Sequence, residues 1–353
     1  MITNVFSGIG LHAVGGIAAA SCYVPLKGTP GWSYQSYWLL FCLSGWFVMP
    51  IGVAVLTVPN LGQILSEAPI HAIGTTTLLG AIYGFGGMAF ALGIRHIGFS
   101  LTYAIAIGIS AVLGTVVPAI MEGNLIESFR NPGGMTVLTG FAISIAGVAL
   151  CGWAGVRKER ELVGRNDAGT STFNIRKGLT LVILAGVLSA VFGLSLAAGD
   201  PIDEVARRHG VTDFQSHVTY IFAMGGAFLT NLLWWSVVHV RNGTFGEYVA
   251  LPSSPTTKGK LSAHYFFGIL SGVLWFGQFF FYGLGHVRMG NFAFMSWGIH
   301  MTMLVFFSFG IGYVFKEWRN LSRKTAGTLY WGLITLLASF AVITYGSWVG
   351  TRT

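Results

Sequence analysis

The sequence predicts an all-α integral membrane protein with ten transmembrane helices in two inverted five-helix repeats. The composition predicts the membrane location, because 53% of the 353 residues are hydrophobic and only 9% are charged, whereas soluble domains carry about 25% charged residues. Ten apolar segments, each long enough to cross a bilayer, predict the helix count. A similarity between the two halves of the chain predicts the repeats.

The first segment carries a stripe of small residues. Gly8, His12, Gly16 and Ala20 recur at every fourth position, which places them on one face of a helix and favours close packing against a neighbouring helix. The ten segments that we expect to span the membrane are residues 4–24, 38–58, 72–94, 98–120, 134–156, 178–199, 215–240, 262–284, 292–315 and 326–349.

Two connections have recognisable features. After the sixth segment, Asp200 as N-cap, Pro201 at the first position and Gly210 at the end predict a short surface helix. The connection 241–261 is rich in turn-forming residues and predicts an irregular, mobile loop.

The basic residues predict the orientation of the chain. If the N-terminus lies outside, fifteen Lys and Arg residues fall in inside connections and five in outside parts, as the positive-inside rule requires. Both termini are therefore expected outside, which is the periplasmic side if the membrane is the bacterial cytoplasmic (inner) membrane that the resemblance described below implies. The net charge of +8 is explained by cytoplasmic loops facing anionic lipid, and no nucleic-acid partner is expected.

The connection 157–177 is a basic cytoplasmic linker between a first five-helix repeat, 1–156, and a second, 178–353. The two repeats form a single membrane domain. A shift of 192 positions places residues 80–98 on 272–290, with four glycine or leucine identities and two aromatic matches. An odd number of spans in each half requires the halves to be inverted relative to each other.

The eighth segment carries a polar stripe. Trp275, Gln278 and Tyr282 stand at positions i, i+3 and i+7, on one helical face. An amide, a phenol and an indole suit a polyhydroxylated ligand, because hydroxyls need donors and acceptors and a sugar ring stacks on aromatic rings. The alternative is that the polar groups bond between helices while Trp275 packs.

The ninth segment carries a second stripe, formed by Ser296, Trp297 and His300. His12 and His300 are the ionisable residues expected deepest in the membrane. Because histidine titrates near pH 6.5, either could carry a proton during transport, although a neutral imidazole bonded across helices fits equally well. No Asp or Glu falls in the middle of a predicted span, so if transport is coupled to protons, the carrier must be a histidine or a carboxylate nearer the surface.

Metal and cofactor signals are weak. The three cysteines, Cys22, Cys42 and Cys151, form no CxxC pair and are expected to pack, and no HExxH spacing occurs. We expect no metal, no cofactor and no catalytic residues. Haem ligation by His12 and His300 remains an alternative.

The motifs QFFFYGLGHVR, SWGIHM and KEW in residues 278–318 resemble the corresponding segments of bacterial L-rhamnose–proton symporters. SCYVPLK (21–27), GWSY (31–34), IAIGIS (105–110) and EGN (122–124) add to the resemblance, which extends over nearly the whole chain. It implies the drug/metabolite transporter superfamily, with a central cavity that opens to alternate sides, and uptake of L-rhamnose or a similar 6-deoxyhexose with a proton.

The residue types of the family pattern recur at several positions of this chain. The positions that have the same residue type as the family pattern are His12, Arg95, Gln278, His286, Ser296, Trp297, His300, Lys316 and Glu317. The chain departs from the pattern at Gln35 and Ala293, where relatives can carry acids, and at Gly87 and Ala89, where they carry asparagines. We expect these departures around the cavity, where they bear on the identity of the sugar and of the coupling ion.

The sequence thus predicts a secondary transporter rather than an enzyme, with a small sugar, a proton and the lipid bilayer as its partners. Trp275, Gln278, Tyr282, Ser296, Trp297 and His300 are the predicted sugar-binding residues, and His12 and His300 are the predicted proton-coupling residues. Two alternatives remain. One is a transporter or exporter of another small metabolite, and the other is a membrane-embedded enzyme or haem protein. The sequence specifies no oligomeric state.

Overall fold

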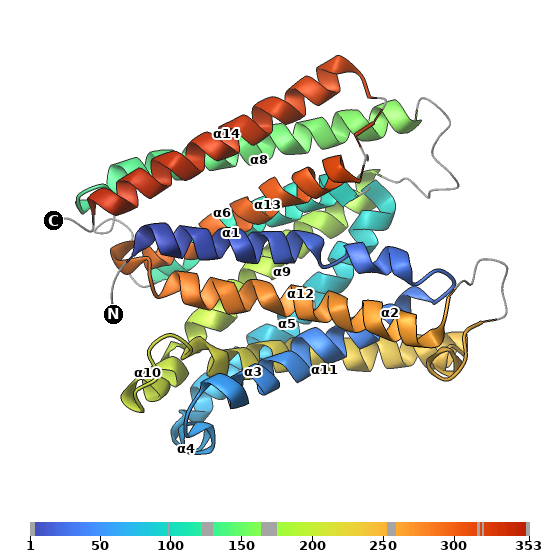
Figure 1. The fold of residues 1–353 in the computed structure, drawn as a ribbon, viewed down its shortest axis with the longest axis horizontal. Helices are drawn as coiled ribbons and strands as arrows, with labels where there is room; N and C mark the ends of the chain where they lie inside the picture. The colour runs from blue at the N-terminus through green and yellow to red at the C-terminus, as the bar shows by residue number, and fades with distance from the viewer. Residues whose placement is uncertain are drawn as a thin grey trace. The chain divides into compact units, whose positions relative to one another are not determined.

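The computed structural model describes residues 4–97, 99–121, 130–163, 175–252, 259–315, 318–319 and 321–350, and over these ranges the regular structure is helical (Figure 1). The α-helices are α1 (Val5–Ser21), α2 (Tyr34–Cys42), α3 (Met49–Thr57), α4 (Leu61–Glu67), α5 (Ile70–Ile97), α6 (Phe99–Met121), α8 (Gly134–Val163), α9 (Ile175–Ala198), α10 (Asp200–Arg208), α11 (Ser216–Asn242), α12 (Leu261–His286), α13 (Ser296–Val314) and α14 (Arg323–Val349). Short 3₁₀ or π turns are η1 (Val24–Gly28), η2 (Leu43–Val48), η3 (Phe245–Tyr248) and η4 (Gly290–Met295).

The chain is a multi-pass helical membrane protein. Within the described residues, nine stretches are long and apolar enough to span a bilayer, and they correspond to nine of the ten predicted segments. The remaining segment, 98–120, forms α6, whose apolar part is the shorter stretch Leu101–Val117. The count of ten spans stays a prediction.

The second span, which the sequence predicts as one segment, contains a change of helix type. Ser33 caps α2 by accepting a hydrogen bond from the Ser36 N–H. The chain then widens into the π-helix η2, in which the Met49 N–H bonds to the Ser44 carbonyl five residues back. Pro50 follows, and because proline has no N–H and its ring crowds the carbonyl four residues earlier, the wider turn accommodates it.

The predicted short helix after the sixth span is confirmed as α10, with two corrections. Its N-cap is Gly199 rather than Asp200, and Gly210, with φ +84°, follows its end. The expectation of a surface helix is wrong for one face, because Asp203 is only 6% exposed. That face packs with α4, a helix that the sequence analysis missed, in an apolar cluster that includes Ile64, Ile202 and Val205.

The prediction of an irregular, mobile loop at 241–261 is wrong for residues 244–248. Here η3 is fastened to the start of α2 by the Glu247 carboxylate, whose Oε2 accepts from the Ser33 N–H at 3.0 Å and from the Ser33 and Ser36 hydroxyls, both at 2.6 Å. The Trp32 indole N–H also donates to the Glu247 carbonyl at 3.0 Å. We call this set of contacts the Glu247 latch.

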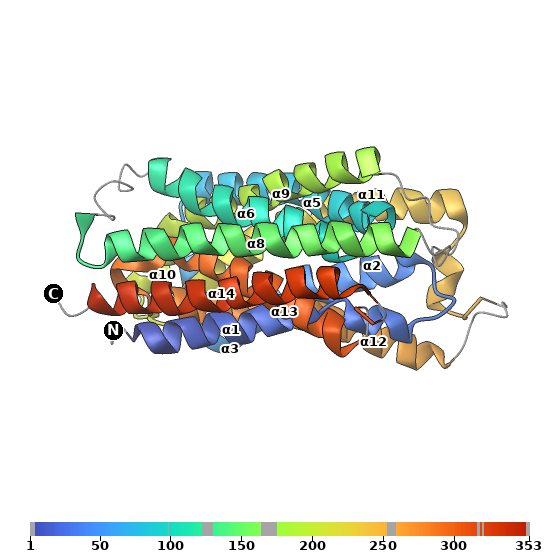
Figure 2. The same cartoon turned by 90° about the horizontal axis from the view of Figure 1, so that it is seen from above.

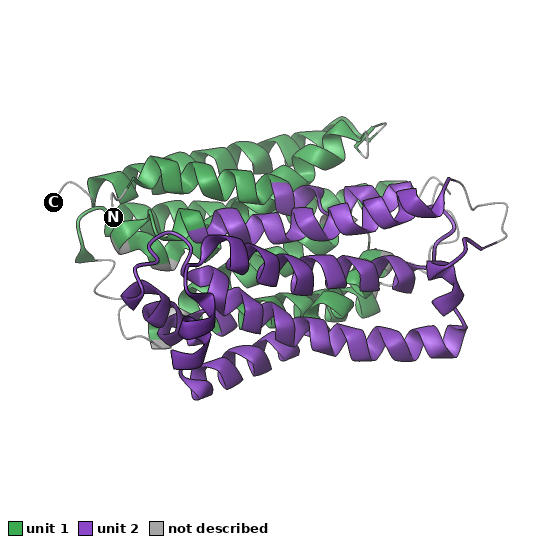
Figure 3. Cartoon of the chain, turned by 60° about the horizontal axis from the view of Figure 1, so that its bottom comes forward, with its two compact units in different colours: residues 1–17, 86–194, 284–353 green, residues 18–85, 195–283 purple. Residues whose placement is uncertain are grey.

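The chain divides into two compact units (Figure 3). Unit 1 comprises residues 1–17, 86–194 and 284–353, and unit 2 comprises residues 18–85 and 195–283. Each unit therefore draws on both halves of the chain. Helices α5 and α12 each continue from one unit into the other.

In unit 1, α8 and α14 lie side by side along most of their length (Figures 1 and 2). Glycines permit this approach: a Cβ at Gly140 would lie 2.6 Å from Ile343 Cγ1, and a Cβ at Gly147 would lie 2.6 Å from Leu336 Cδ2. An apolar cluster fills the interior of the unit. Its buried members are Val5, Val137, Phe141, Met289, Phe292, Met295, Ile299, Met303 and Ile343.

In unit 2, α11 packs against α2, η2 and α3. The buried Asn231 joins three helices: its Oδ1 accepts from the Trp38 indole N–H at 2.9 Å, and its amide donates to the Gly84 and Ala227 carbonyls, both at 3.0 Å. Because every one of these groups is hydrogen-bonded, the polar contact is compatible with a dry interior.

Candidate functional site

The predicted stripe on α12 lies in unit 2. Trp275 is 6% exposed and Gln278 is 3% exposed, so both side chains are buried. The Gln278 side-chain amide donates to the Trp275 carbonyl at 3.0 Å, within its own helix. Tyr282 follows one turn later, half-buried, with its ring centroid 6.4 Å from that of Phe279.

Trp275 belongs to an aromatic cluster, defined here as Trp38, Phe41, Trp46, Tyr83 and Trp275. The ring centroid of Trp46 lies 5.2 Å from that of Trp275 and 5.9 Å from that of Tyr83. Phe41 joins Trp38 at 5.0 Å and Trp275 at 6.2 Å. Such rings offer flat apolar faces with polar edges.

Trp46 is the functional candidate that the sequence analysis missed. Its indole Nε1 is buried and has no hydrogen-bond partner among the described residues. Buried polar groups are normally paired, so an orphaned donor beside aromatic faces suits a ligand that brings an acceptor. A tryptophan in an apolar segment gives no signal of this kind by itself. Only the contacts with α5 and α12 distinguish Trp46.

The predicted stripe on α13 lies in unit 1. Trp297 is 4% exposed, and its indole N–H donates to the Ser110 carbonyl at 3.0 Å. A Cβ at Gly114 would lie 2.4 Å from the Trp297 Nε1, so the ring fits into a groove of α6. The Ser296 hydroxyl is buried without a hydrogen-bond partner among the described residues. Trp297 is thus held by protein contacts, whereas the Ser296 hydroxyl is left without a partner among the described residues.

The two predicted proton carriers meet in unit 1. His12 on α1 and His300 on α13 are both fully buried, with ring centroids 5.8 Å apart in an edge-to-face arrangement. His286, at the end of α12, is close enough to interact electrostatically with His12. The pairing of positions 12 and 300, far apart in the sequence, is a result that the sequence could not provide.

The stripe of small residues on α1 explains how the histidine pair forms. A Cβ at Gly285 would lie 3.0 Å from His12 Cε1, and a Cβ at Gly8 would lie 3.1 Å from the Gly285 carbonyl oxygen. Gly16 faces Met303 at a similar distance of 3.1 Å. Glycines on either side of His12 therefore bring α1 close to the end of α12 and to α13, as their spacing predicted for residues 8–16.

The structure shows the surroundings of two departures from the family pattern, Gln35 and Ala293. The Gln35 amide donates to the Thr244 hydroxyl at 3.1 Å, beside the Glu247 latch. Ala293 packs against the apolar cluster of unit 1. Lys316, Glu317 and residues 122–124 lie outside the described residues, as do residues 164–174 of the predicted linker and the side chain of Arg95.

A cavity of about 550 Å³ lies in unit 1 at the ends of α13 and α14. It is lined by Tyr313, Val314, Trp318, Arg319, Ala326, Leu329 and Tyr330. None of the predicted sugar-binding residues lines it, so it is distinct from both stripes.

The described residues contain no group of three or more His, Cys, Asp or Glu side chains arranged to hold a metal ion.

Comparisons with known proteins agree over nearly the whole chain. The model of the family described as "L-rhamnose-proton symport protein (RhaT)" matches residues 1–348. The chain is 30% identical over 345 residues to the L-rhamnose-proton symporter of Mannheimia succiniciproducens, covering 97% of this chain and 98% of the relative. It is also 30% identical over 348 residues to the L-rhamnose-proton symporters of Yersinia pestis and Yersinia pseudotuberculosis, covering 98% of this chain and 99% of each relative. Symporters are secondary transporters and not enzymes, and on this evidence the chain belongs to the L-rhamnose-proton symport protein family.

Proposed function

We propose that the protein imports L-rhamnose, or a similar 6-deoxyhexose, together with a proton across the bacterial cytoplasmic membrane by alternating access. The family description and the names of the relatives support the sugar and the proton. The structural observation that carries the proposal is the buried His12–His300 pair, because adjacent imidazoles inside an apolar bundle suit reversible proton binding.

The aromatic cluster of unit 2 is the proposed sugar-binding surface on α12. Trp46 and Trp275 would stack on the apolar face of the sugar, and the Trp46 indole N–H would donate to a sugar hydroxyl. Gln278 would contribute its amide, since its bond to the Trp275 carbonyl lies within one helix turn and can be exchanged for a ligand hydroxyl. Tyr282 would bind through its phenol at the next turn.

The stripe on α13 is the proposed second sugar surface. Ser296 and His300 would bind hydroxyls, and Trp297 would supply a ring face while its N–H stays bonded to Ser110. Each of the two stripes, the one on α12 and the one on α13, thus offers polar groups beside an aromatic face, which suits a hydroxylated ring that has an apolar methyl group.

The proposed proton carriers are His12 and His300. Two positive charges separated by the 5.8 Å between the ring centroids would repel by about 3 kcal/mol at an effective dielectric of about 20. The pair therefore suits one exchangeable proton rather than two. His300 would link the proton to the sugar, because it also belongs to the stripe on α13.

The proposed architecture keeps ten spans in two inverted halves, with both termini periplasmic. The unit boundaries support the repeat. They cut α5 between residues 85 and 86 and α12 between residues 283 and 284, 198 positions apart and close to the 192-residue shift that aligns these two helices. Corresponding helices of the two halves thus pass from one unit to the other at nearly corresponding places.

The proposed function is tested by uptake of radiolabelled L-rhamnose into vesicles from cells that lack their own rhamnose transport. We expect accumulation when the vesicle interior is made alkaline, and its loss when a protonophore is added. Entry without accumulation would refute proton coupling while keeping the sugar. An absence of entry would refute the sugar assignment and require a screen of other metabolites, exported ones included.

Variants then test the residues. Gln278→Ala is expected to raise the KM for the sugar at least tenfold, since a buried hydrogen bond contributes about 1.4 kcal/mol or more. Trp46→Phe should also raise KM, because it removes the indole N–H that is proposed to bind a sugar hydroxyl. The phenyl ring keeps the aromatic face, so the variant tests the N–H alone. The exposed Gln63→Ala, on α4, is the matched control for the glutamine. Normal uptake by Gln278→Ala would refute the proposal that the stripe on α12 binds the sugar.

The histidines require a different readout. His12→Gln and His300→Gln should lose accumulation driven by the pH gradient, while exchange of labelled for unlabelled sugar continues. If both variants accumulate sugar at the wild-type level, the proton carrier is another residue.

A further inference from the structure

Asp203 is a buried carboxylate that the proposed mechanism does not use. Its side chain is 6% exposed, on the face of α10 that also buries Ile202, Val205 and Ala206. The apolar residues of this face join residues of α4 and α11 in one cluster. An ionised carboxylate in such a place is costly unless it is paired and hydrogen-bonded, so the contacts of Asp203 decide what it can do.

The Thr219 hydroxyl lies between two oxygen atoms. Its Oγ1 is 2.6 Å from Asp203 Oδ1 and 3.1 Å from the Gly199 carbonyl oxygen. A hydroxyl has a single proton to donate, and a carbonyl oxygen and an ionised carboxylate both only accept. Both short contacts are separate, two-centre hydrogen bonds at the same time when Asp203 carries a proton and donates it to Thr219, which then donates to Gly199; with an ionised Asp203, the two acceptors must share the one hydroxyl proton.

The same geometry also satisfies the ionised carboxylate. When Asp203 loses its proton, Thr219 can turn its O–H toward Oδ1. The Gly199 carbonyl still accepts from the Ile202 and Asp203 backbone N–H groups, at 2.8 and 3.1 Å. Each charge state thus keeps its hydrogen bonds, and the change between them requires only the rotation of one hydroxyl.

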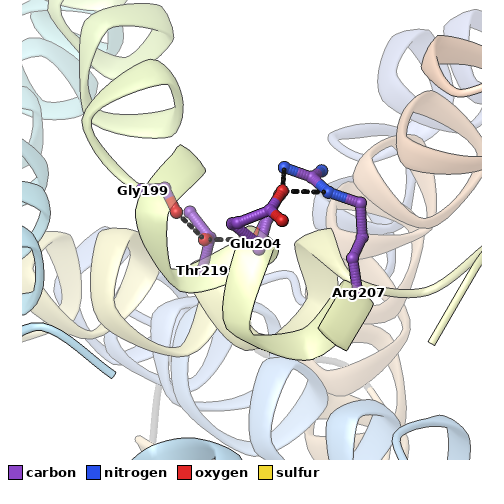
Figure 4. A network of polar contacts seen from close by, with 5 residues as sticks. Gly199, Glu204, Arg207 and Thr219 are labelled. Atoms are coloured by element: carbon purple, nitrogen blue, oxygen red, sulfur yellow. Dashed lines mark hydrogen bonds and ion pairs between the residues drawn. The ribbon is translucent and has the colours of Figure 1, made fainter. Parts of the chain in front are cut away.

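The basic residue nearest along the helix is engaged elsewhere. Arg207 lies one turn after Asp203, and its Nε and Nη2 are both 2.8 Å from Glu204 Oε2 (Figure 4). Other polar and charged groups surround the carboxylate. Those that interact with it are Asp200 and Arg207 on α10 and Ser216, Thr219 and Tyr220 on α11. The other titratable groups on the elements packed here are Glu204 and Arg208 on α10, His217 on α11, and Glu67 on α4 with its partner His209.

The backbone at Gly199 is part of the arrangement. A Cβ at this position would lie 2.2 Å from Thr219 Cγ2, so only glycine allows Thr219 to approach the carbonyl. The turn between α9 and α10 is thus shaped around the Thr219 hydroxyl.

We propose that Asp203 is a proton-binding site of the transport cycle, with Thr219 switching its hydroxyl between the carboxylate and the Gly199 carbonyl as the proton leaves and arrives. The proton passes between Asp203 Oδ1 and water at the end of α10, and no bond to carbon changes. In the proposed orientation this connection lies on the periplasmic side, where a symported proton enters. The coupling to sugar rests on the proposed function, whereas the binding of a proton does not.

The first experiment measures proton binding directly on the purified wild-type protein. Infrared difference spectra between acidic and alkaline buffer should contain a protonated-carboxyl band that disappears as the pH rises. The band should be absent in Asp203→Asn and retained in Asp213→Asn, a matched control in the same connection. In Thr219→Val the protonated-carboxyl band should persist to higher pH, because the ionised Asp203 carboxylate loses the hydroxyl that donates to it. Thr219→Ser keeps a hydroxyl and should titrate like the wild type. A spectrum of Asp203→Asn identical to that of the wild type would overturn the proposal.

The second experiment measures coupling in vesicles. Asp203→Asn should exchange labelled for unlabelled sugar but not accumulate it, and addition of sugar should no longer make the medium alkaline, whereas Asp213→Asn should behave like the wild type. Wild-type accumulation and alkalinisation by Asp203→Asn would overturn the role in coupling. If the wild-type protein does not transport L-rhamnose, the proposed function fails while the infrared titration still decides whether Asp203 binds a proton.

Discussion

The Glu247 latch gives a stability prediction whose size follows from its contacts. In Glu247→Ala, three donors lose their acceptor: the Ser33 N–H and the Ser33 and Ser36 hydroxyls. The two hydroxyls lie 2.9 Å apart and can bond to each other, so the N–H is the group left without a partner. One hydrogen bond to a charged acceptor contributes about 1.5–3 kcal/mol, and the half-exposed carboxylate favours the lower part of this range.

A loss of about 2 kcal/mol corresponds to a fall in Tm of roughly 4–8 °C for a unit of this size. Thermal unfolding of the purified protein in detergent, followed by tryptophan fluorescence, measures it. Limited proteolysis within residues 241–261 should become faster, because η3 is released from α2. The exposed Glu204→Gln is the control and should move the free energy of unfolding by less than about 0.5 kcal/mol. An unchanged Tm and an unchanged cleavage rate in Glu247→Ala would refute the latch.

Two further predictions concern packing and pH. Gly140→Ala should destabilise the protein by about 1–3 kcal/mol, since its Cβ would meet Ile343 at 2.6 Å, whereas Gly225→Ala, with open space around its Cβ, should stabilise α11 by roughly 0.5–1 kcal/mol. Equal Tm values for Gly140→Ala and Gly225→Ala would contradict the close approach of α8 and α14. The hydrogen bond from His209 at 2.9 Å lowers the pKa of Glu67 below its ordinary value of 4.5. Glu67 therefore stabilises the fold above that value and ceases to do so as the pH falls through its lowered pKa, and Glu67→Gln should flatten the pH dependence of Tm in that acidic range.

Much of the architecture could be predicted because a bilayer imposes long apolar helices with inward polar groups. The spacing of Gly8, His12 and Gly16 predicted a packing stripe, and these residues do face α12 and α13. The burial of Trp275 and Gln278 followed from their period along α12. Local sequence carries these features, since the periodicity of a helix decides which side chains share a face.

The remaining features depend on contacts between distant segments. Asp203 stands in a short helix with acidic and basic ends, a pattern typical of a solvated helix, and its burial depends on α4 and on Thr219 of α11. In the sequence, nothing distinguishes Trp46 from the aromatic residues near it. Only its contacts with α5 and α12 in the structure identify it as a candidate. Glu247 lies in a connection whose composition predicts an irregular, mobile loop, yet the Ser33 and Ser36 groups that bind its carboxylate are more than two hundred positions away. No local pattern contains this information.

The π-helix η2 has a consequence for comparing this chain with its relatives. A π turn holds about one residue more than an α turn, so it sets the rotation of α3 relative to α2 about the axis of the span. Trp38, 1% exposed, precedes it and Leu56, 84% exposed, follows it. A relative that lacks one residue within Leu43–Val48 would have a plain α-helix there with both faces preserved. The same deletion within α3 would turn the residues beyond it by about 100° and direct Leu56 away from the lipid.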